Sequence, residues 1–517
     1  MADNLASFKV FCQGGLNTSR DVLSQGETQP GSAISLINYE PSVTGGYRKI
    51  NGFSNDYGTV TGTGNVLGVC VANGINDGIL ACRTPSSGSN YLHYWDTSTE
   101  AWVAVTTSGS PTMSGVTKIR FTKYNWGSPK VMLTDGINPA ATYDGTTYTQ
   151  ITHADAPSAP KFSHVYKNHM FLAGDPSEDT NLYFSAPYDE TSFAAADGAG
   201  VINVGFPVVA IKSFRDILYI FGSNNIRKLA GDNISNFVLQ EVTDDLGCLA
   251  TDSVIEIGGD LLFLSQDGLR PVSGTDKIGD VNLETVSKDI QSVFTDVVFD
   301  IDLEGLNAVV IRQKTQFRYF FAASETQGII GGFRQTPNGL QFEYSQMLGI
   351  TATCADSGYI GQNEYVIHGD SAGKVHRQER GTDFDGGEIF SSFQTPYLHM
   401  QDPEQRKIFY SVATYLRSEG DNQIAMSAVY DYEDVDVLNP NDFQLTNEGA
   451  AAYYNEATYA ADDATSGAIY DGNPSPVRRT NISGSGKAVS FRYVTNDTNP
   501  SHSIQGLVIT FGVGDRL

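Results

Sequence analysis

Residues that could carry a reaction are scattered through this 517-residue chain at spacings that match no catalytic site. A hydrolase needs a nucleophile close to a base, or two carboxylates at a set separation. The sequence indicates no nucleophile elbow, no HExxH pair and no GxxxxGK[ST] phosphate loop. We therefore expect no catalytic residue and no cofactor, and we expect the protein not to be an enzyme.

Histidines are the first candidates for metal ligands. The chain has eight, including His164 with His169 and His368 with His376. None stands at metal-ligand spacing from a carboxylate or a cysteine. We expect these histidines in turns or at the surface, and no metal site is predicted from them.

Two acidic runs could present oxygens to Ca²⁺. They are TDFDGGE at 382–388 and DYEDVD at 431–436. Neither has the glycine and glutamate positions of an EF-hand loop. Asx turns account for the same residues, because aspartate side chains accept hydrogen bonds from the backbone two or three residues further on.

Three tryptophans, Trp95, Trp102 and Trp126, could present flat faces to sugars. Packing inside a β fold is the more common fate of such side chains. A receptor- or glycan-binding protein therefore remains an alternative function. A propeller-fold glycoside hydrolase is a second alternative, which would need acids converging on the axis of the fold.

The strongly acidic composition limits the partners. The formal net charge is −26, from 59 Asp and Glu against 33 Lys and Arg. Affinity for DNA depends on basic side chains that neutralise phosphates, and the longest basic clusters are the pairs Arg48–Lys49 and Arg478–Arg479. We expect no specific binding of nucleic acid.

The cysteines and the chain start bear on the compartment. Five cysteines without CxxC spacing argue against a disulfide framework and favour a reducing compartment. The start MADNLASFKV lacks a signal-peptide pattern, and no apolar run approaches the roughly 18 residues of a membrane span. We expect synthesis and folding in the cytoplasm.

A repeated pattern of strand, Gly/Asp turn, strand and aromatic residue predicts the fold. It recurs about every 35 to 50 residues between positions 65 and 387, the period of four-stranded blades around an axis. Asp135-Gly136 and Asp144-Gly145 mark tight turns in the second unit. After the first two units, others are expected near 161–196, 207–245, 248–280, 303–347 and 351–387. The predicted class is all-β, with a β-propeller-like domain of six or seven blades over 57–387.

The two ends of the chain follow other patterns. From 388 to 517, longer alternating strands predict a C-terminal antiparallel β-sandwich, with a surface excursion around 439–476. Residues 1–56 are rich in turn formers and predict an extended arm that packs on its own propeller or on a neighbouring subunit.

One short stretch has the period of a helix. Leu283, Val286, Ile290, Val293 and Phe294 recur at three- and four-residue spacings, which places them on one face of a helix. We expect this helix to cap or bridge a blade.

Several strings resemble the tail nozzle proteins (tail tubular protein B, or stabilisation proteins) of short-tailed bacteriophages. They are GGLN (14–17), GGYRKINGF (45–53), LYFSAPYDETSF (182–193), ILYIFGSNNIRKLAG (217–231), LGCLATDSV (246–254), LLFLSQDGLRPVSG (261–274), TPYLHMQDPEQRKIF (395–409) and IQGLVITFGVGD (504–515). The resemblance spans most of the chain through strand-and-turn motifs.

The resemblance implies a structural protein of the virion tail. It implies a homo-hexameric ring whose propellers surround a channel for the genomic DNA during ejection, and attachment to an adaptor protein beneath the portal. The chain is short for this family, which leaves tail-fibre attachment open, and contact with the host envelope at the distal end is a further expectation. An acidic channel wall would pass DNA without drag from phosphate contacts.

Assembly is expected to involve the N-terminal segment. A weakly structured arm can order on a neighbour, so residues 14–53 are assigned an assembly role. The residues predicted to carry it are Gly14, Gly15, Leu16, Asn17, Gly45, Gly46, Tyr47 and Arg48.

Overall fold

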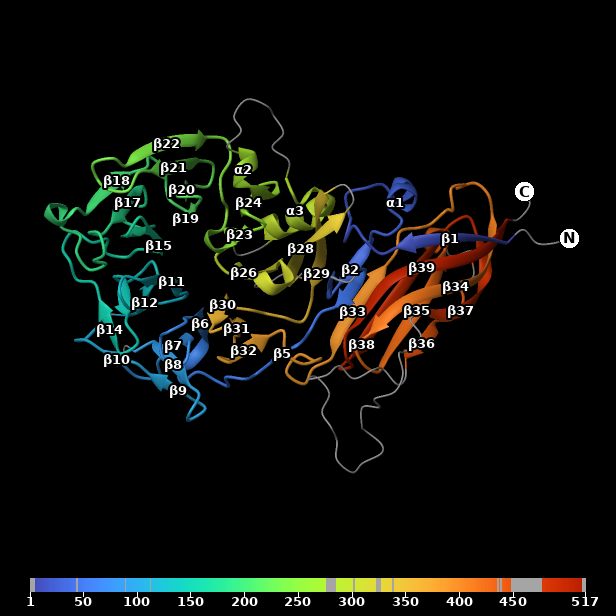
Figure 1. Ribbon diagram of the computed structural model, residues 1–517, viewed down its shortest axis with the longest axis horizontal. Helices are drawn as coiled ribbons and strands as arrows, with labels where there is room; N and C mark the ends of the chain where they lie inside the picture. Colours follow the sequence, from blue (N-terminus) through green and yellow to red (C-terminus); the bar gives the residue numbers. More distant parts are fainter. Residues whose placement is uncertain are drawn as a thin grey trace.

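The protein is all-β, with a ring of small sheets at one end and a β-sandwich at the other (Figure 1). The computed structural model describes residues 5–42, 45–88, 90–111, 113–275, 285–300, 303–321, 327–336, 339–434, 437, 439–447 and 477–513. Within these residues no helix has the length and hydrophobicity needed to cross a membrane.

The first four blades follow one another along the chain, and each is a separate sheet. Blade 1 contains β6 (Thr63–Val71), β7 (Ile79–Thr84), β8 (Leu92–Asp96) and β9 (Ala101–Ala104). Blade 2 contains β10 (Thr106–Thr107), β11 (Arg120–Asn125), β12 (Pro129–Thr134), β13 (Ala141–Tyr143) and β14 (Thr147–Gln150). Blade 3 contains β15 (Phe162–Tyr166), β16 (His169–Ala173), β17 (Asn181–Phe184) and β18 (Gly200–Asn203), with η1 (Ala195–Asp197) before its last strand. Blade 4 contains β19 (Ala210–Phe214), β20 (Ile217–Phe221), β21 (Ile226–Ala230) and β22 (Val238–Thr243).

Three further blades complete the ring, so the described strands form seven. Blade 5 contains η2 (Thr251–Ser253), β23 (Ile255–Ile257), β24 (Asp260–Ser265) and β25 (Gly268–Pro271), followed by α2 (Val272–Thr275), η3 (Lys288–Ile290) and α3 (Gln291–Asp300). Blade 6 contains β26 (Asn307–Ile311), η4 (Arg312–Lys314), β27 (Gln316–Phe320), β28 (Gly328–Thr336) and β29 (Gly339–Met347). Blade 7 contains β30 (Cys354–Ile360), β31 (Asn363–Gly369) and β32 (Val375–Gln378).

The start of the chain closes this ring. The outer strand of blade 7 is β5 (Phe53–Ser54), which pairs antiparallel with β32. A blade built from both ends of the propeller sequence joins the first and last units by backbone hydrogen bonds, so the ring is held shut without a covalent link.

Apolar side chains between the blades form the propeller core. The strands are rich in Val, Ile, Phe and Tyr, which fit a pleated surface. Buried aromatic rings meet across neighbouring blades, as where Phe221 of blade 4 lies 5.2 Å from Phe263 of blade 5, measured between ring centroids. The predicted turns also form: the Asp135 and Asp144 carboxylates each accept two backbone N–H groups, and Gly136 and Gly145 have φ of +78° and +91°.

The C-terminal strands form the predicted sandwich, together with strands from the N-terminal segment. One sheet has the order β3-β4-β39-β34-β37, with β1 also paired to β39. The strands are β1 (Leu5–Phe11), β3 (Tyr39–Pro41), β4 (Tyr47–Lys49), β34 (Lys407–Ser418), β37 (Val477–Gly486) and β39 (His502–Val513). The facing sheet contains β2 (Ser35–Ile37), β33 (Ile389–Gln394), β38 (Val489–Asp497), β35 (Asn422–Tyr430) and β36 (Phe443–Asn447), with η5 (Asp431–Glu433) after β35. Phe409 stacks on Tyr430 across the two layers, with centroids 5.4 Å apart.

The predicted extended arm over 1–56 is instead part of the folded core. Strands β1 to β4 pair within the sandwich, and α1 (Val22–Thr28) begins at Asp21, whose carboxylate accepts the Ser24 N–H. Strands β3 and β4 pair with each other, but β1 and β2 take their hydrogen bonds from β39, β29 and β33, which lie hundreds of residues away and cannot be found from local sequence. Sheets therefore cross the expected boundaries at 56/57 and 387/388.

The predicted helix is confirmed in its second half. Ile290, Val293 and Phe294 are buried on η3 and α3, and Val286 packs against the same cluster. Leu283 lies outside the described residues. Of the expected excursion at 439–476, residues 443–447 form β36 on the edge of the sandwich, and 448–476 lie outside the described residues.

A single sheet connects the propeller to the sandwich. Its order is β26-β27-β28-β29-β2-β33-β38-β35-β36, so blade 6 continues through β2 into the sandwich. Strand β2 lies parallel to β29 and antiparallel to β33. The propeller and the sandwich therefore share backbone hydrogen bonds, and Figure 1 shows β29, β2 and β33 side by side where the two lobes meet.

Buried ion pairs stabilise the same junction. Arg318 on β27 is fully buried and contacts both Glu379 and Glu40, with 3.6 Å to the second carboxylate. Lys314 pairs with the same two carboxylates, and Arg48 pairs with Glu40 at 3.0 Å. These residues come from β3, β4, blade 6 and the end of blade 7.

The pH dependence of stability tests this junction. The Arg318 and Lys314 charges lower the pKa of Glu379 from 4.5 to about 2, despite its burial. A lowered folded-state pKa stabilises the protein above pH 4.5, and this contribution is lost as the pH falls towards 2. We expect the free energy of unfolding, measured by urea denaturation, to fall less steeply over this range in Glu379→Gln than in the unmodified protein. Equal slopes would contradict the assignment.

Candidate functional site

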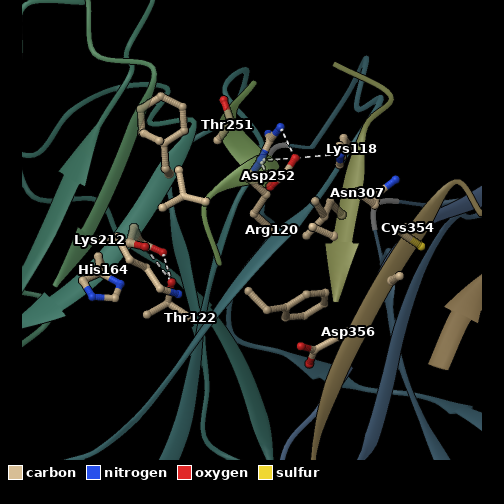
Figure 2. Close-up of a pocket in the computed structure, with 18 of the residues that line it drawn as sticks. Lys118, Arg120, Thr122, His164, Lys212, Thr251, Asp252, Asn307, Cys354 and Asp356 are labelled. Carbon is tan, nitrogen blue, oxygen red and sulfur yellow. Dashed lines mark hydrogen bonds and ion pairs between the residues drawn. The ribbon is translucent and has the colours of Figure 1, made fainter. Parts of the chain in front are cut away.

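The axis of the propeller holds a cavity of about 230 Å³. Its walls come from the innermost strand of every blade or from the residues just before it: β6, β11, β15, β19, β23, β26 and β30. Figure 2 shows the polar side chains that line it. Ligands commonly bind in such concave sites with a few convergent polar groups, so this cavity is the candidate functional site.

Hydrogen bonds around the axis fix the cavity walls. Each pair of neighbouring blades shares at least one: Ile119 N to Leu67 O (2.8 Å), Thr122 Oγ1 to Ser163 O (2.7 Å), Ser213 N to His164 Nε2 (2.9 Å), Thr251 Oγ1 to Val209 O (2.8 Å), Tyr319 OH to Ser253 O (2.6 Å), Asn307 Nδ2 to Thr353 O (3.1 Å) and Thr353 Oγ1 to Val66 O (2.8 Å). These bonds satisfy the polar groups that take part in them and link every blade to its neighbours, which makes the walls of the site rigid.

One end of the cavity holds an ion cluster centred on Asp252. Arg120 Nε and Nη2 donate to both carboxylate oxygens at 2.8–3.1 Å, and Lys118 Nζ lies 2.7 Å from Oδ2. Lys118 also donates to the carbonyl oxygens of Glu304 and Leu306, each at 3.0 Å. The two cations hold the pKa of Asp252 well below its usual range, so this carboxylate is ionised and does not act as a general acid near neutral pH.

Elsewhere in the cavity, Asp356 and Cys354 of β30 are also held in unreactive states. Asp356 Oδ2 accepts the Val71 N–H at 2.8 Å and pairs with Lys123 Nζ at 2.9 Å. Burial raises the pKa of the Cys354 thiol to about 12, so it stays protonated and is a poor nucleophile. The described lining residues can therefore contribute charges and hydrogen bonds to a ligand.

The histidines predicted to lie in turns or at the surface are mostly buried, which corrects that expectation. His169, His368 and His376 are at most 4% exposed, and His368 and His376 stack on paired strands of blade 7 with centroids 4.9 Å apart. His164 lines the axial cavity. An imidazole ring can fill an aromatic layer between blades, and sequence spacing gives no sign of this role. No group of three or more His, Cys, Asp or Glu in the described residues is placed to hold a metal ion.

The first acidic run forms the expected Asx-type turn, whereas the second begins with η5 and contacts the distant turn between β37 and β38. Asp383 Oδ1 accepts the Gly386 N–H at 2.7 Å, and Asp431 Oδ1 accepts the N–H groups of Lys487 and Ala488. Residues 435 and 436 of the second run lie outside the described residues.

The sequence contains one string of the GxSxG type, at residues 369–373, which the motif search did not identify. The structure places it in the hairpin turn between β31 and β32, where Asp370 Oδ2 lies 3.1 Å from His376 Nε2. A nucleophile elbow requires a strand-to-helix turn that exposes the serine above a sheet. This string leads from one strand into the next, so it does not form such an elbow.

The three tryptophans pack within the propeller. Trp102 Nε1 donates to the Tyr57 carbonyl at 2.7 Å and its ring meets Trp95 edge to face, while Trp126 packs on Tyr124. Part of each ring is exposed, and none of the three lines the axial cavity.

The residues predicted for assembly lie at the base of the sandwich and contact their own chain. Gly14 N donates to Glu343, Gly15 N to the Tyr47 hydroxyl and Leu16 N to the Tyr344 carbonyl. The other members behave alike: Asn17 bonds to Asp289, Tyr47 to the Gly31 carbonyl, Arg48 to Glu419 and Glu40, and Gly46 packs on Ile504. Their role in assembly stays a prediction, and it would have to act through the folded sandwich because no described part of this segment forms a free arm.

Comparisons with known proteins find only weak structural similarity among the solved structures described below. No protein-family model and no curated protein matches the chain. Among solved structures, KlHsv2 with loop 6CD replaced by a Gly-Ser linker shares 12% identity, with 52% of this chain and 81% of that chain covered and a TM-score of 0.31. BBS1N in complex with ARL6DN shares 12% identity, with 40% and 64% covered and a TM-score of 0.27. The computationally designed Ika8 protein shares 9% identity, with 62% and 98% covered and a TM-score of 0.32. The fold is defined by the strand pairing of the described residues.

Removing the central carboxylate tests the ion cluster. Asp252→Asn removes the anion shared by Lys118 and Arg120 and leaves Arg120 only the longer contact to Glu304 at 3.8 Å. Because 24% of the Asp252 side chain is exposed, we expect a loss of about 2 to 3 kcal/mol, below the range for fully buried pairs. Asp216→Asn is the matched control, because that carboxylate is 88% exposed and pairs with Lys167 at the surface. Urea denaturation measures both. Similar losses in the two variants would contradict the structural role given to Asp252.

A glycine pair tests how the N-terminal segment meets the sandwich. Gly45 and Gly46 have φ of +93° and +81°, so a side chain strains the backbone at either position by about 1 to 2 kcal/mol. A Cβ on Gly46 would also lie 2.2 Å from the Ile504 carbonyl oxygen, whereas one on Gly45 meets nothing within 4 Å. We expect Gly46→Ala to lower the free energy of unfolding clearly more than Gly45→Ala. Equal effects in denaturant titrations would refute this close contact.

Proposed function

We propose that the protein is a noncatalytic structural subunit of a bacteriophage tail, which forms a nozzle ring through which genomic DNA leaves the capsid. The observation that carries the proposal is the continuous sheet from blade 6 through β2 to β36, which makes the propeller and the sandwich one unit. A wall element of a conduit has to keep its shape under load, and a joint built from backbone hydrogen bonds is stiffer than a linker.

The positions of the family-like strings support the same proposal. GGLN and GGYRKINGF lie at the junction between the sandwich and blade 6, where Gly15 and Gly46 pack against backbone of distant strands. The strings at 182–193, 217–231 and 261–274 lie in blades 3, 4 and 5. The resemblance therefore concerns the residues that build the junction and the blades.

Net charge is the second support. A chain with a formal charge of −26 repels phosphates, so rings of it would let DNA pass without holding it. The family resemblance further assigns six copies per ring, an adaptor protein beneath the portal as the neighbour, and a place in the virion tail. Fibre attachment and envelope contact belong to the same proposal.

Sizing and imaging of the purified full-length protein test the proposal. We expect light scattering after size exclusion to give a mass near six chains at high protein concentration, and negative-stain images to show rings with a central opening. The adaptor protein from the same phage serves as a second arm, because it would nucleate rings that form weakly alone. A protein that stays monomeric in both arms would contradict a nozzle.

Two binding assays distinguish the alternatives on the same sample. We expect no shift of duplex DNA in a gel assay at physiological salt, because phosphate contacts need basic side chains that this surface lacks in number. A glycan array is expected to give no signal. Specific glycan binding lost in Trp126→Ala would favour the receptor-binding function instead.

A further inference from the structure

Lys212 on β19 is an unpaired cation in the wall of the axial cavity. The other lysine of the lining, Lys118, is paired with Asp252 at 2.7 Å, whereas the described residues offer Lys212 Nζ no ion pair and no hydrogen bond. Figure 2 shows Lys212 beside His164, away from the cluster around Asp252. The Lys212 side chain is half-buried, so its ammonium group is partly shielded from water and has no anionic partner among the described residues.

The charges around Lys212 leave an excess of positive charge. Lys123 and Arg312 act on Lys212 as nearby cations, and Asp356 and Glu256 act on it as nearby anions. Asp356 is already engaged by Lys123 and by the Val71 N–H. Burial is the largest cause that lowers the pKa of Lys212; Lys123 and Arg312 lower it further, whereas Glu256 and Asp356 raise it.

His164 adds a neutral donor next to Lys212. Its Nε2 accepts the Ser213 backbone N–H at 2.9 Å, so the ring hydrogen of the neutral form is on Nδ1. Burial, with the charge of Lys212, lowers the pKa of His164 to about 3, so this neutral form persists at physiological pH. The described residues provide no hydrogen-bond acceptor for Nδ1–H. One ammonium and one N–H donor therefore line the same side of the cavity.

We propose that the axial cavity binds one small oxyanion of the size of inorganic phosphate, with Lys212 as its counter-charge and His164 as a second donor. The cavity, with a volume of about 230 Å³, is large enough for such an ion with a few waters and too small for a folded polymer. Hydrogen bonds between all seven blades hold the walls in place, so the site is preformed. Binding therefore costs little conformational entropy. This site goes beyond the nozzle function and does not depend on it.

Calorimetric titration of the full-length protein with inorganic phosphate at neutral pH and low ionic strength tests the proposal. We expect the unmodified protein to bind and Lys212→Met, which keeps the length of the side chain without its charge, to bind at least about tenfold more weakly. Lys212→Arg keeps the charge and should retain binding. Lys167→Met is the matched control, because that lysine lies at the surface of the neighbouring blade and pairs with Asp216, and its affinity should not change.

Thermal unfolding separates loss of binding from loss of fold. Without phosphate, Lys212→Met should be at least as stable as the unmodified protein, because it removes a half-buried charge that has no partner among the described residues. With about 10 mM phosphate, the midpoint should rise in the unmodified protein and in Lys167→Met but not in Lys212→Met. Acetate in a parallel series shows whether the oxyanion is a phosphate or a carboxylate. The proposal is overturned if neither anion binds or stabilises the unmodified protein, or if Lys212→Met responds to the same extent.

Discussion

Three residues of strand β2 and the asparagine that follows them hold the two halves of this protein together. Strand β2 pairs with β29 of blade 6 on one side and with β33 of the sandwich on the other. Asn38, fully buried with φ of +54°, extends the connection: its amide donates to the carbonyls of Leu348 and Phe390 and accepts the Leu348 N–H. Because this one short strand joins blade 6 to the sandwich within a single sheet, neither half is complete without the N-terminal segment.

The buried charges at this junction follow from the same constraint. The edge of the propeller, the N-terminal strands and the sandwich meet at this junction. Charged side chains are buried there, between the apolar cores of the two halves. Arg318, Lys314 and Arg48 face Glu40 and Glu379 there, and each charge has a partner of opposite sign. Such networks contribute little net stability compared with apolar packing, but they penalise any other arrangement of the two halves because a misplaced charge would be buried alone.

Closure of the ring imposes a different demand at the axis. The innermost strands converge, so their side chains have to be satisfied by neighbouring blades, as Thr122 is by Ser163 and His164 by Ser213. The Asp252 cluster meets this demand with opposite charges, and Lys212 does not. The axis is thereby a rigid, charged cavity, which sets it apart from the apolar clusters between the blades.

Residues close together in the chain account for the local structure, namely the turns at Asp135 and Asp144, the helix that buries Ile290 and Phe294, and the period that yields the blades. Three features arise only when distant segments pack together: the pairing of the N-terminal strands within the sandwich, the burial of His368 and the grouping of Lys212 with His164. Each of these depends on strands or blades that are distant in sequence and meet only when the ring and the sandwich close, and no local pattern encodes such a meeting.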